Sequence, residues 1–122
     1  MDIKKTEGED LQTVASLLRN YWKERGMNYD QEWTINYLLK GHATEIKKDQ
    51  SFVLKDNDKL IGTISLITYV SDVAEIRDFV VKKEYRSKGY GKKLLEFVLD
   101  YAKRNEIRKI YALIFQKYHL FY

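Results

Sequence analysis

Residues 73–95 read VAEIRDFVVKKEYRSKGYGKKLL, and this stretch decides the fold. Residues 73–82 are rich in β-branched and other apolar side chains, which favours a strand. From Tyr90 onward the apolar residues recur at helical spacing, so we expect a helix over residues 90–104. A basic loop with two glycines, Gly89 and Gly91, lies between them. The stretch therefore predicts a strand, a loop and a helix whose first N–H groups are accessible.

The sequence on both sides adds further elements. Upstream it predicts a strand at residues 3–6, helices over 9–26 and 30–41, and strands at 51–55 and 59–69. Downstream it predicts a strand at residues 108–115 and the start of a helix at 116–122. The order is β-α-α-β-β-β-α-β-α. The strand–helix–strand unit over residues 73–115 predicts two parallel strands with a helix N-terminus between their ends.

The composition is that of an ordinary globular protein. The length of 122 residues predicts one domain, residues 1–122, and the balance of 44% apolar and 33% charged residues is not that of a disordered chain. The sequence has no cysteine, which excludes disulfides and a cysteine nucleophile. It shows no signal-peptide-like or membrane-spanning apolar run, so we expect a cytoplasmic protein without a membrane partner.

The loop before the predicted helix has the properties of an anion site. The first N–H groups of a helix have no partner inside it, and the helix dipole adds partial positive charge there. Gly89 and Gly91 lack a Cβ, so a diphosphate can approach the backbone closely. The pattern also fits a flexible turn with a solvated basic face. It is not the dinucleotide fingerprint, because the first of that motif's three glycines is missing. It is not a P-loop either, because no Ser or Thr follows Gly91-Lys92. The surrounding basic residues are Lys82, Lys83, Arg86, Lys88, Lys92 and Lys93.

The pattern Arg-x-x-Gly-x-Gly, after Phe79-Val80-Val81 and before a helix, resembles the acetyl-CoA motif of the GNAT superfamily of N-acetyltransferases. Residues 75–95 carry the specific resemblance, and the element order extends it over essentially the whole chain. It implies an α/β (α+β) fold with a mixed, mostly antiparallel central sheet flanked by helices. It also implies acetyl-CoA as cosubstrate, with its pantetheine arm paired to the strand at Phe79, Val80 and Val81. The implied pyrophosphate site is the backbone of Arg86, Ser87, Lys88, Gly89, Tyr90, Gly91 and Lys92.

Acetyl transfer to an amine needs a base for the amine, a donor to the oxyanion and a proton for the leaving thiolate. Glu75 resembles in placement the base glutamate of the histone-acetylating branch of the family. Asp78 is the competing carboxylate, and Glu75 also fits a solvent-facing partner of Arg77 or a lysine. Arg77 alternatively fits the role of holding an acidic substrate. The family's geometry implies the backbone N–H near Val80 as the oxyanion donor. Strand alternation predicts Glu75, Arg77 and Phe79 on one face, and Ile76, Asp78 and Val80 on the other.

Tyr122 is the candidate acid for the thiolate, because Phe121-Tyr122 matches by order the aromatic pair at the start of the family's last helix. Tyr118 is the alternative, and a packing role is common for a tyrosine in a chain that has ten. His42 and His119 have no neighbouring ligands, so no metal is expected. Aromatic residues of the first two helices are expected in the core or in the walls of the acceptor site: Trp22, Trp33 and Tyr37.

The function expected from the resemblance is transfer of the acetyl group of acetyl-CoA to a primary amine of a small molecule or peptide. With no cysteine to carry an acyl group, direct attack in a ternary complex is expected. The alternative is a non-catalytic acyl-CoA-binding or regulatory module, because the family pattern continues with two strands beyond the last residue here. The strand at residues 108–115 would then keep an open edge, which a homodimer is expected to cover. Nucleic acid is not an expected partner, since the net charge is only +4 and the tyrosines are scattered.

Overall fold

The computed structural model describes residues 1–40, 48–68 and 72–112. Short 3-10 turns at Gly8–Asp10 and Lys83–Tyr85 precede α1 and follow β4. The helix predicted at residues 116–122 lies outside the described residues, as does the end of the strand predicted at 108–115. The elements in order are β1 (Asp2–Lys5), α1 (Leu11–Lys23), α2 (Gln31–Lys40), β2 (Lys48–Asp56), β3 (Lys59–Thr68), β4 (Val73–Val81), α3 (Tyr90–Arg104) and β5 (Lys109–Ala112).

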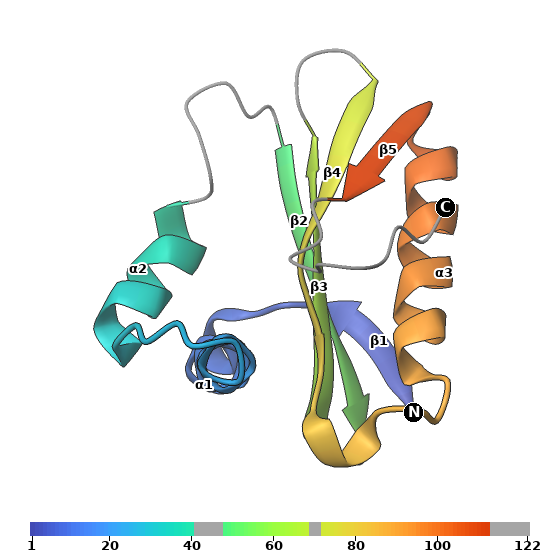
Figure 1. The fold of residues 1–122 in the computed structure, drawn as a ribbon. Coiled ribbons are helices and arrows are strands. Elements are labelled where there is room, and N and C mark those ends of the chain that lie inside the picture. Colours follow the sequence, from blue (N-terminus) through green and yellow to red (C-terminus); the bar gives the residue numbers. More distant parts are fainter. Residues whose placement is uncertain (41–47, 69–71, 113–122) are drawn as a thin grey trace.

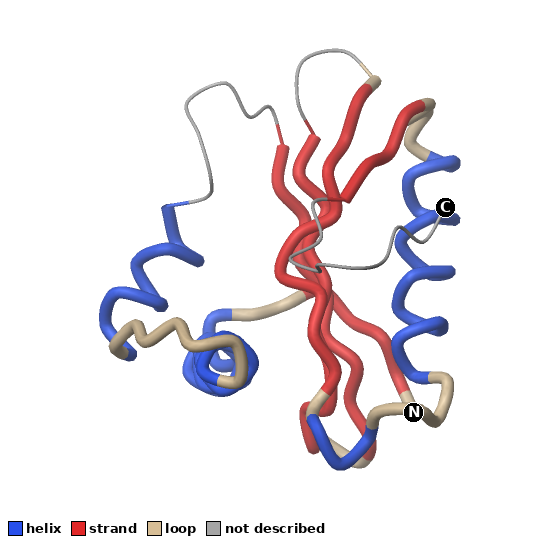
Figure 2. Tube along the Cα trace, viewed as in Figure 1, coloured by secondary structure: helices blue, strands red, loops and turns tan. Residues whose placement is uncertain are grey.

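The strands form one sheet in the order β1-β2-β3-β4-β5. The first three pairings are antiparallel and the β4–β5 pairing is parallel. Helices α1 and α2 lie on one side of the sheet, and α3 lies on the other (Figure 1). Figure 2 shows the strands as one twisted central layer between them. The predicted fold class, a mixed and mostly antiparallel sheet flanked by helices, is confirmed, as is the parallel strand–helix–strand unit.

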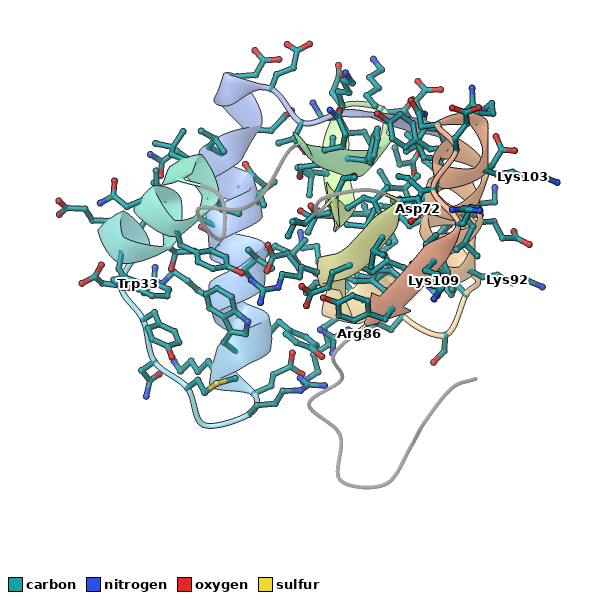
Figure 3. The ribbon with its side chains drawn as sticks, turned by 90° about the horizontal axis from the view of Figure 1, so that it is seen from above. Trp33, Asp72, Arg86, Lys92, Lys103 and Lys109 are labelled. Carbon is teal, nitrogen blue, oxygen red and sulfur yellow. The ribbon has the colours of Figure 1, made fainter. Side chains whose placement is uncertain are left out.

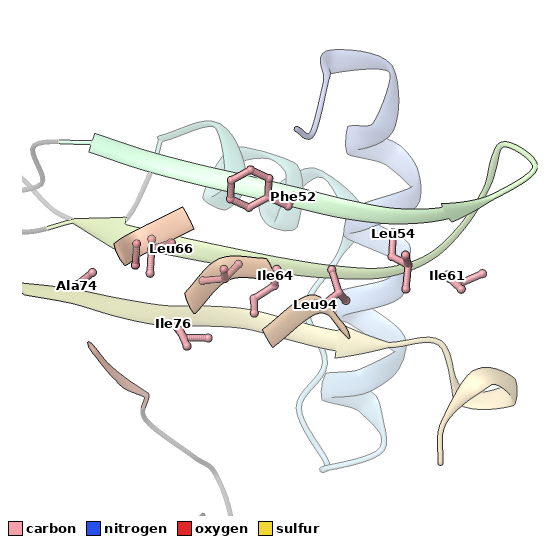
Figure 4. Packing of buried hydrophobic residues seen from close by; sticks show 10 residues of the cluster. Phe52, Leu54, Ile61, Ile64, Leu66, Ala74, Ile76 and Leu94 are labelled. Atoms are coloured by element: carbon pink, nitrogen blue, oxygen red, sulfur yellow. The ribbon is translucent and has the colours of Figure 1, made fainter. Parts of the chain in front are cut away.

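The sheet buries an apolar layer on each face. The larger layer lies between the sheet and α3, where Leu94, Val98 and Ala102 meet the strands (Figure 4). The smaller layer joins α1 to the opposite face of the sheet. Because both faces are covered, β3 is buried over most of its length. The strand residues of the larger layer are Phe52, Leu54, Ile61, Ile64, Leu66, Ala74 and Ile76.

Local signals set the ends of several elements where the sequence predicted them. Helix α3 begins at Tyr90 and ends at Arg104, as expected. Asp30 caps α2 by accepting a hydrogen bond from the backbone N–H of Trp33 at 2.7 Å. Asn105 follows α3 as predicted, but its φ is −102°, and the left-handed residue is Glu106 with φ of 60°. The side chain of Asn105 instead donates to the carbonyl of Tyr101 at 2.8 Å.

Strand β4 contains a bulge in its middle. Ser65 of β3 pairs with Arg77 and Thr63 pairs with Val80, so two steps along β3 oppose three along β4. The extra residue lies at Asp78, whose φ is 50°. Aspartate is one of the few residues with a side chain that tolerates this left-handed conformation.

The bulge reverses which side chains share a face, so the predicted alternation is wrong beyond Arg77. Phe79 packs in the layer on the α3 side together with Ile76, whereas Val80 packs in the layer on the α1 side. Asp78 contacts Tyr37 of α2. A strand without a bulge would have placed Phe79 on the face opposite to Ile76. The two middle carboxylates of β4 therefore share the α1/α2 side of the sheet with Val80.

We expect Leu94→Ala to lower the free energy of unfolding by about 2–5 kcal/mol, because it removes a buried side chain from the larger layer. Leu99→Ala is the matched control on the same helix. Leu94 is 0% exposed and Leu99 is 43% exposed, so the control is expected to change stability by about 0.5 kcal/mol at most. Urea denaturation followed by circular dichroism measures both. Equal losses in the two variants would contradict this account of the core.

Candidate functional site

The loop that enters α3 presents a run of open backbone amides. Ser87 and Gly89 have φ of 63° and 89°, and left-handed residues within such a turn direct successive N–H groups into one concavity. In the described part of the chain, the amides of residues 87–92 donate to no acceptor, and the first bonded amide is that of Lys93, to the Gly89 carbonyl at 3.1 Å. Ser87, Lys88 and Gly89 are exposed. Six amides at a helix N-terminus are therefore available to an anion.

The Arg86 side chain is engaged within the protein. Its Nε donates to the Val81 carbonyl at 2.8 Å, and its two terminal nitrogens donate to the Glu24 carboxylate at 3.0 and 3.1 Å. The Arg86 backbone N–H donates to the Lys83 carbonyl at 3.3 Å. Arg86 is among the residues predicted to hold pyrophosphate, but its backbone N–H and its guanidinium already donate hydrogen bonds within the protein. Its evident role is to tie the amide loop to the end of α1.

Glu24 is a site residue that sequence reasoning missed. It lies 62 positions from Arg86, and no spacing rule connects the two. The hydrogen bonds from Arg86 lower the pKa of the Glu24 carboxyl below its ordinary value, which outweighs partial desolvation. Around this pair, Lys88 and Lys92 of the loop region remain exposed, and Figure 3 shows Lys92 pointing away from the ribbon. These lysines leave the predicted basic surface partly intact.

The amide loop adjoins an open segment of β4. Strand β5 pairs with Val73–Ile76 only, so no described strand pairs with residues 77–81 on that side. Phe79, Val80 and Val81, the residues predicted to pair with pantetheine, all belong to this segment. A Cβ at Gly91 would lie 3.6 Å from the Phe79 ring and 3.7 Å from Val81, so a small residue lets the start of α3 pack closely on β4. The open amides and the open strand segment therefore lie side by side.

Glu75 is buried on the α1/α2 side of the sheet. It is 2% exposed, and its Oε2 accepts a hydrogen bond from Arg77 Nε at 3.0 Å. The predicted partnership with Arg77 is therefore present, but Glu75 does not face solvent. Its register partner on β5 is Tyr111, so Glu75 lies within the paired part of β4.

Asp78 is half-buried on the same side of the sheet as Glu75, beyond the last described β4–β5 pair. Its Oδ1 accepts a hydrogen bond from the Tyr37 hydroxyl at 3.0 Å. Burial raises the pKa of the Asp78 carboxyl to about 6, while the Tyr37 hydrogen bond and the Arg77 charge lower it. Burial, followed by the Asp78 charge, raises the pKa of Tyr37 above its ordinary value. Tyr37 and Asp78 lie 41 positions apart, so no local sequence pattern indicates this contact.

An aromatic row continues from Tyr37 along α2. The rings of Tyr37 and Trp33 stack at 5.6 Å between centroids, and those of Trp33 and Tyr29 stack at 4.3 Å. Trp22 of α1 meets all three rings edge-on. Trp33 is 46% exposed, and Figure 3 shows it at the side of the molecule where α1 and α2 lie. Trp22, Trp33 and Tyr37 therefore lie together, and Tyr37 contacts Asp78. Their place in the wall of an acceptor site stays a prediction.

Several predicted features lie outside the described residues. These are Tyr122, Tyr118, His42 and His119. Within the described ranges, no three His, Cys, Asp or Glu side chains are arranged to hold a metal ion. None of the helices in those ranges is long and apolar enough to cross a membrane. Among the described strands, β5 is an edge strand of the sheet. The homodimer expected to cover this edge stays a prediction.

Comparison with known proteins gives a family match and structural neighbours. The sequence model of the acetyltransferase (GNAT) family matches residues 11–119. A possible acetyltransferase from Clostridium difficile 630 has a TM-score of 0.80 at 24% identity, over 95% of this chain and 80% of that one. A predicted acetyltransferase from Clostridium acetobutylicum, solved with acetyl-CoA, has a TM-score of 0.72 at 16% identity, over 93% and 80%. An aminoglycoside 6'-N-acetyltransferase complexed with coenzyme A has a TM-score of 0.73 at 20% identity, over 92% and 61%.

We expect Glu24→Gln to destabilise the protein at pH 7 by about 0.5–1 kcal/mol, a value reduced for the partial exposure of both partners. Because Arg86 lowers the folded-state pKa of Glu24, this stabilisation is present above the pKa of a free glutamate and is lost as pH falls through the lowered value. Thermal unfolding at pH 7 and at about pH 3 measures the effect. Glu96→Gln, at an exposed position on α3, is the control. A wild-type advantage over Glu24→Gln that is as large in acid would rule out the ion pair as its source.

Proposed function

Because the chain belongs to the GNAT family of acetyltransferases, we propose that it transfers the acetyl group of acetyl-CoA to a primary amine. One observation carries the proposal: the open amides of residues 87–92 lie beside the open segment of β4. A diphosphate suits the first feature, because its oxygens accept several charge-assisted hydrogen bonds at once. An extended amide-containing arm suits the second, because it can add to the strand through backbone hydrogen bonds.

In this proposal the acetyl-CoA pyrophosphate binds the amides of Ser87 to Lys92, and the pantetheine arm pairs with Phe79, Val80 and Val81. Arg86 contributes through its contacts with Val81 and Glu24, which hold the loop in shape before the ligand arrives. A loop held in its bound form loses less conformational entropy on binding. The thioester would then lie near the point where β4 and β5 part, next to the buried carboxylates.

The acceptor amine would enter from the α1/α2 side, along the aromatic row. A carboxylate of β4, Glu75 or Asp78, accepts the proton that the ammonium must lose before its nitrogen can attack. The Val80 backbone N–H stabilises the oxyanion. Tyr122, which lies outside the described residues, supplies the proton to the thiolate. With no cysteine in the chain, direct attack in a ternary complex follows.

The direct test is thiol release from acetyl-CoA across a panel of amines, with calorimetry of coenzyme A binding in parallel. The panel holds amino acids, polyamines, peptides with a free N-terminus or a lysine, and aminoglycosides. A structural neighbour acetylates an aminoglycoside, which supports including that class. Thiol release that depends on one amine class supports the proposal. Coenzyme A binding without release for any amine would favour the non-catalytic acyl-CoA-binding module instead.

We expect Gly89→Ala to weaken coenzyme A binding by about tenfold, which is about 1.4 kcal/mol. A Cβ at φ of 89° is strained, so the loop relaxes and the amides lose their common direction. Gly26→Ala is the matched control, since Gly26 also has a positive φ of 80° and open space for a Cβ. Both variants should lose similar stability, but only Gly89→Ala should lose affinity in calorimetry. A normal dissociation constant for Gly89→Ala would remove the amide loop from the binding site.

A further inference from the structure

Three observations distinguish Asp78 from the neighbouring charged residues of β4, Glu75 and Arg77. It is the extra residue of the bulge, with φ of 50°. It lies two positions beyond Ile76, which pairs with Ala112, the last described residue of β5. The Tyr37 hydroxyl holds its carboxylate from the α1/α2 side at 3.0 Å. A left-handed conformation kept within a strand, in contact with a side chain of another element, is typical of a functional position rather than of a packing residue.

Glu75 differs from Asp78 in its place along β4 and in lying outside the bulge. It lies in the paired part of β4, opposite Tyr111. Its Oε2 accepts a hydrogen bond from Arg77 Nε at 3.0 Å, in an ion pair whose carboxylate is buried while the Arg77 side chain is 32% exposed. A buried carboxylate in contact with a guanidinium mainly orients that guanidinium and balances its charge. The position of Glu75 therefore suits a residue that holds Arg77.

We propose that Asp78 is the catalytic base that deprotonates the acceptor amine, that Tyr37 is its positioning residue, and that Glu75 positions Arg77. This inference rests on the proposed acetyl transfer and assigns the base within it. A carboxyl that titrates near neutral pH can both take up and release a proton under working conditions. The charged and titratable groups that act on Asp78 among the described residues are Tyr37 from α2 and Arg77 and Glu75 from β4.

In this reaction the acceptor nitrogen loses two protons and the acetyl group moves from sulfur to nitrogen. One proton of the ammonium moves to the Asp78 carboxylate, and the freed lone pair forms the new C–N bond at the thioester carbon. Collapse of the tetrahedral oxyanion breaks the C–S bond, and the electron pair leaves with sulfur. A second proton from the nitrogen ends on the thiol. Asp78 then releases its proton to solvent, so that ammonium and acetyl-CoA give the amide, coenzyme A and one proton.

Asp78→Asn is a clean test of this role. Asparagine keeps the size of the side chain, tolerates the left-handed conformation and can still accept from Tyr37, so the bulge should survive. We expect kcat/KM to fall by about 10²–10⁴-fold, with coenzyme A binding by calorimetry near its wild-type value. Asp100→Asn, which alters an exposed aspartate paired with Arg104 on α3, is the control and should leave activity unchanged.

The pH profile separates the two carboxylates. A base must be ionised, so the wild-type kcat/KM is expected to fall as pH drops through about 6. Tyr37→Phe removes a hydrogen bond that lowers the Asp78 pKa, so the acid limb should move to higher pH. Glu75→Gln should retain an acid limb near pH 6 whatever its kcat. If the fall of kcat/KM at low pH is lost in Glu75→Gln and kept in Asp78→Asn, the inference is overturned.

A readout without turnover distinguishes failure of this inference from failure of the proposed function. Carbon-13 spectra of protein labelled at aspartate carboxyls, assigned with Asp78→Asn, should show one carboxyl that titrates near pH 6 and shifts upward in Tyr37→Phe. An active enzyme in which that signal titrates in the ordinary aspartate range would overturn the inference alone. A wild-type protein that binds coenzyme A but releases no thiol with any amine would overturn the proposed function, and the base role with it.

Discussion

The extra residue in β4 is the constraint on which the site depends. A bulge bends a strand and increases its local twist, and the one in β4 follows the segment Val73–Ile76 that pairs with the described residues of β5. The same residue changes which side chains face α3 and which face α1. Beyond these pairs, no described strand pairs with the β5-side edge of residues 77–81. The inserted residue brings Asp78 to the same side of the sheet as Glu75 and Val80, next to this edge.

The contact between Arg86 and Glu24 links the two sides of the molecule around this edge. The loop that bears the open amides leads into α3, while Glu24 ends α1 on the opposite face of the sheet. Arg86 also holds the carbonyl of Val81, the last residue of β4. One guanidinium therefore connects the end of β4, the amide loop and the end of α1. Its planar set of donors makes this possible, since a lysine could not contact all three in fixed geometry.

Local signals in the sequence were enough for most of the fold. The caps and apolar spacing of α3 and the cap at Asp30 act within a few residues, and the structure follows them. The bulge could not be predicted, because nothing in a run of strand-forming residues marks where one will lie unpaired. The contacts of Arg86 with Glu24 and of Tyr37 with Asp78 join positions far apart in the chain, and only the assembled fold brings them together. The candidate loop was visible in the sequence, whereas the surroundings of the carboxylates were not.

The features that cost stability are concentrated in one short segment. Asp78 adopts a left-handed conformation within a strand, the Glu75 carboxylate and the Asp78 Oδ2 atom are buried, and five residues of β4 lack a described partner strand on one side. Each would be unfavourable alone, by about 1–3 kcal/mol for the strained residue. The regular apolar layers on both faces of the sheet offset these costs. Among the described residues, the other left-handed residues that carry a side chain lie in turns or loops, whereas Asp78 lies within a strand. A natural sequence departs from its own local rules chiefly where function requires it. The concentration of such departures around Asp78 is therefore the strongest physical reason to place the chemistry there.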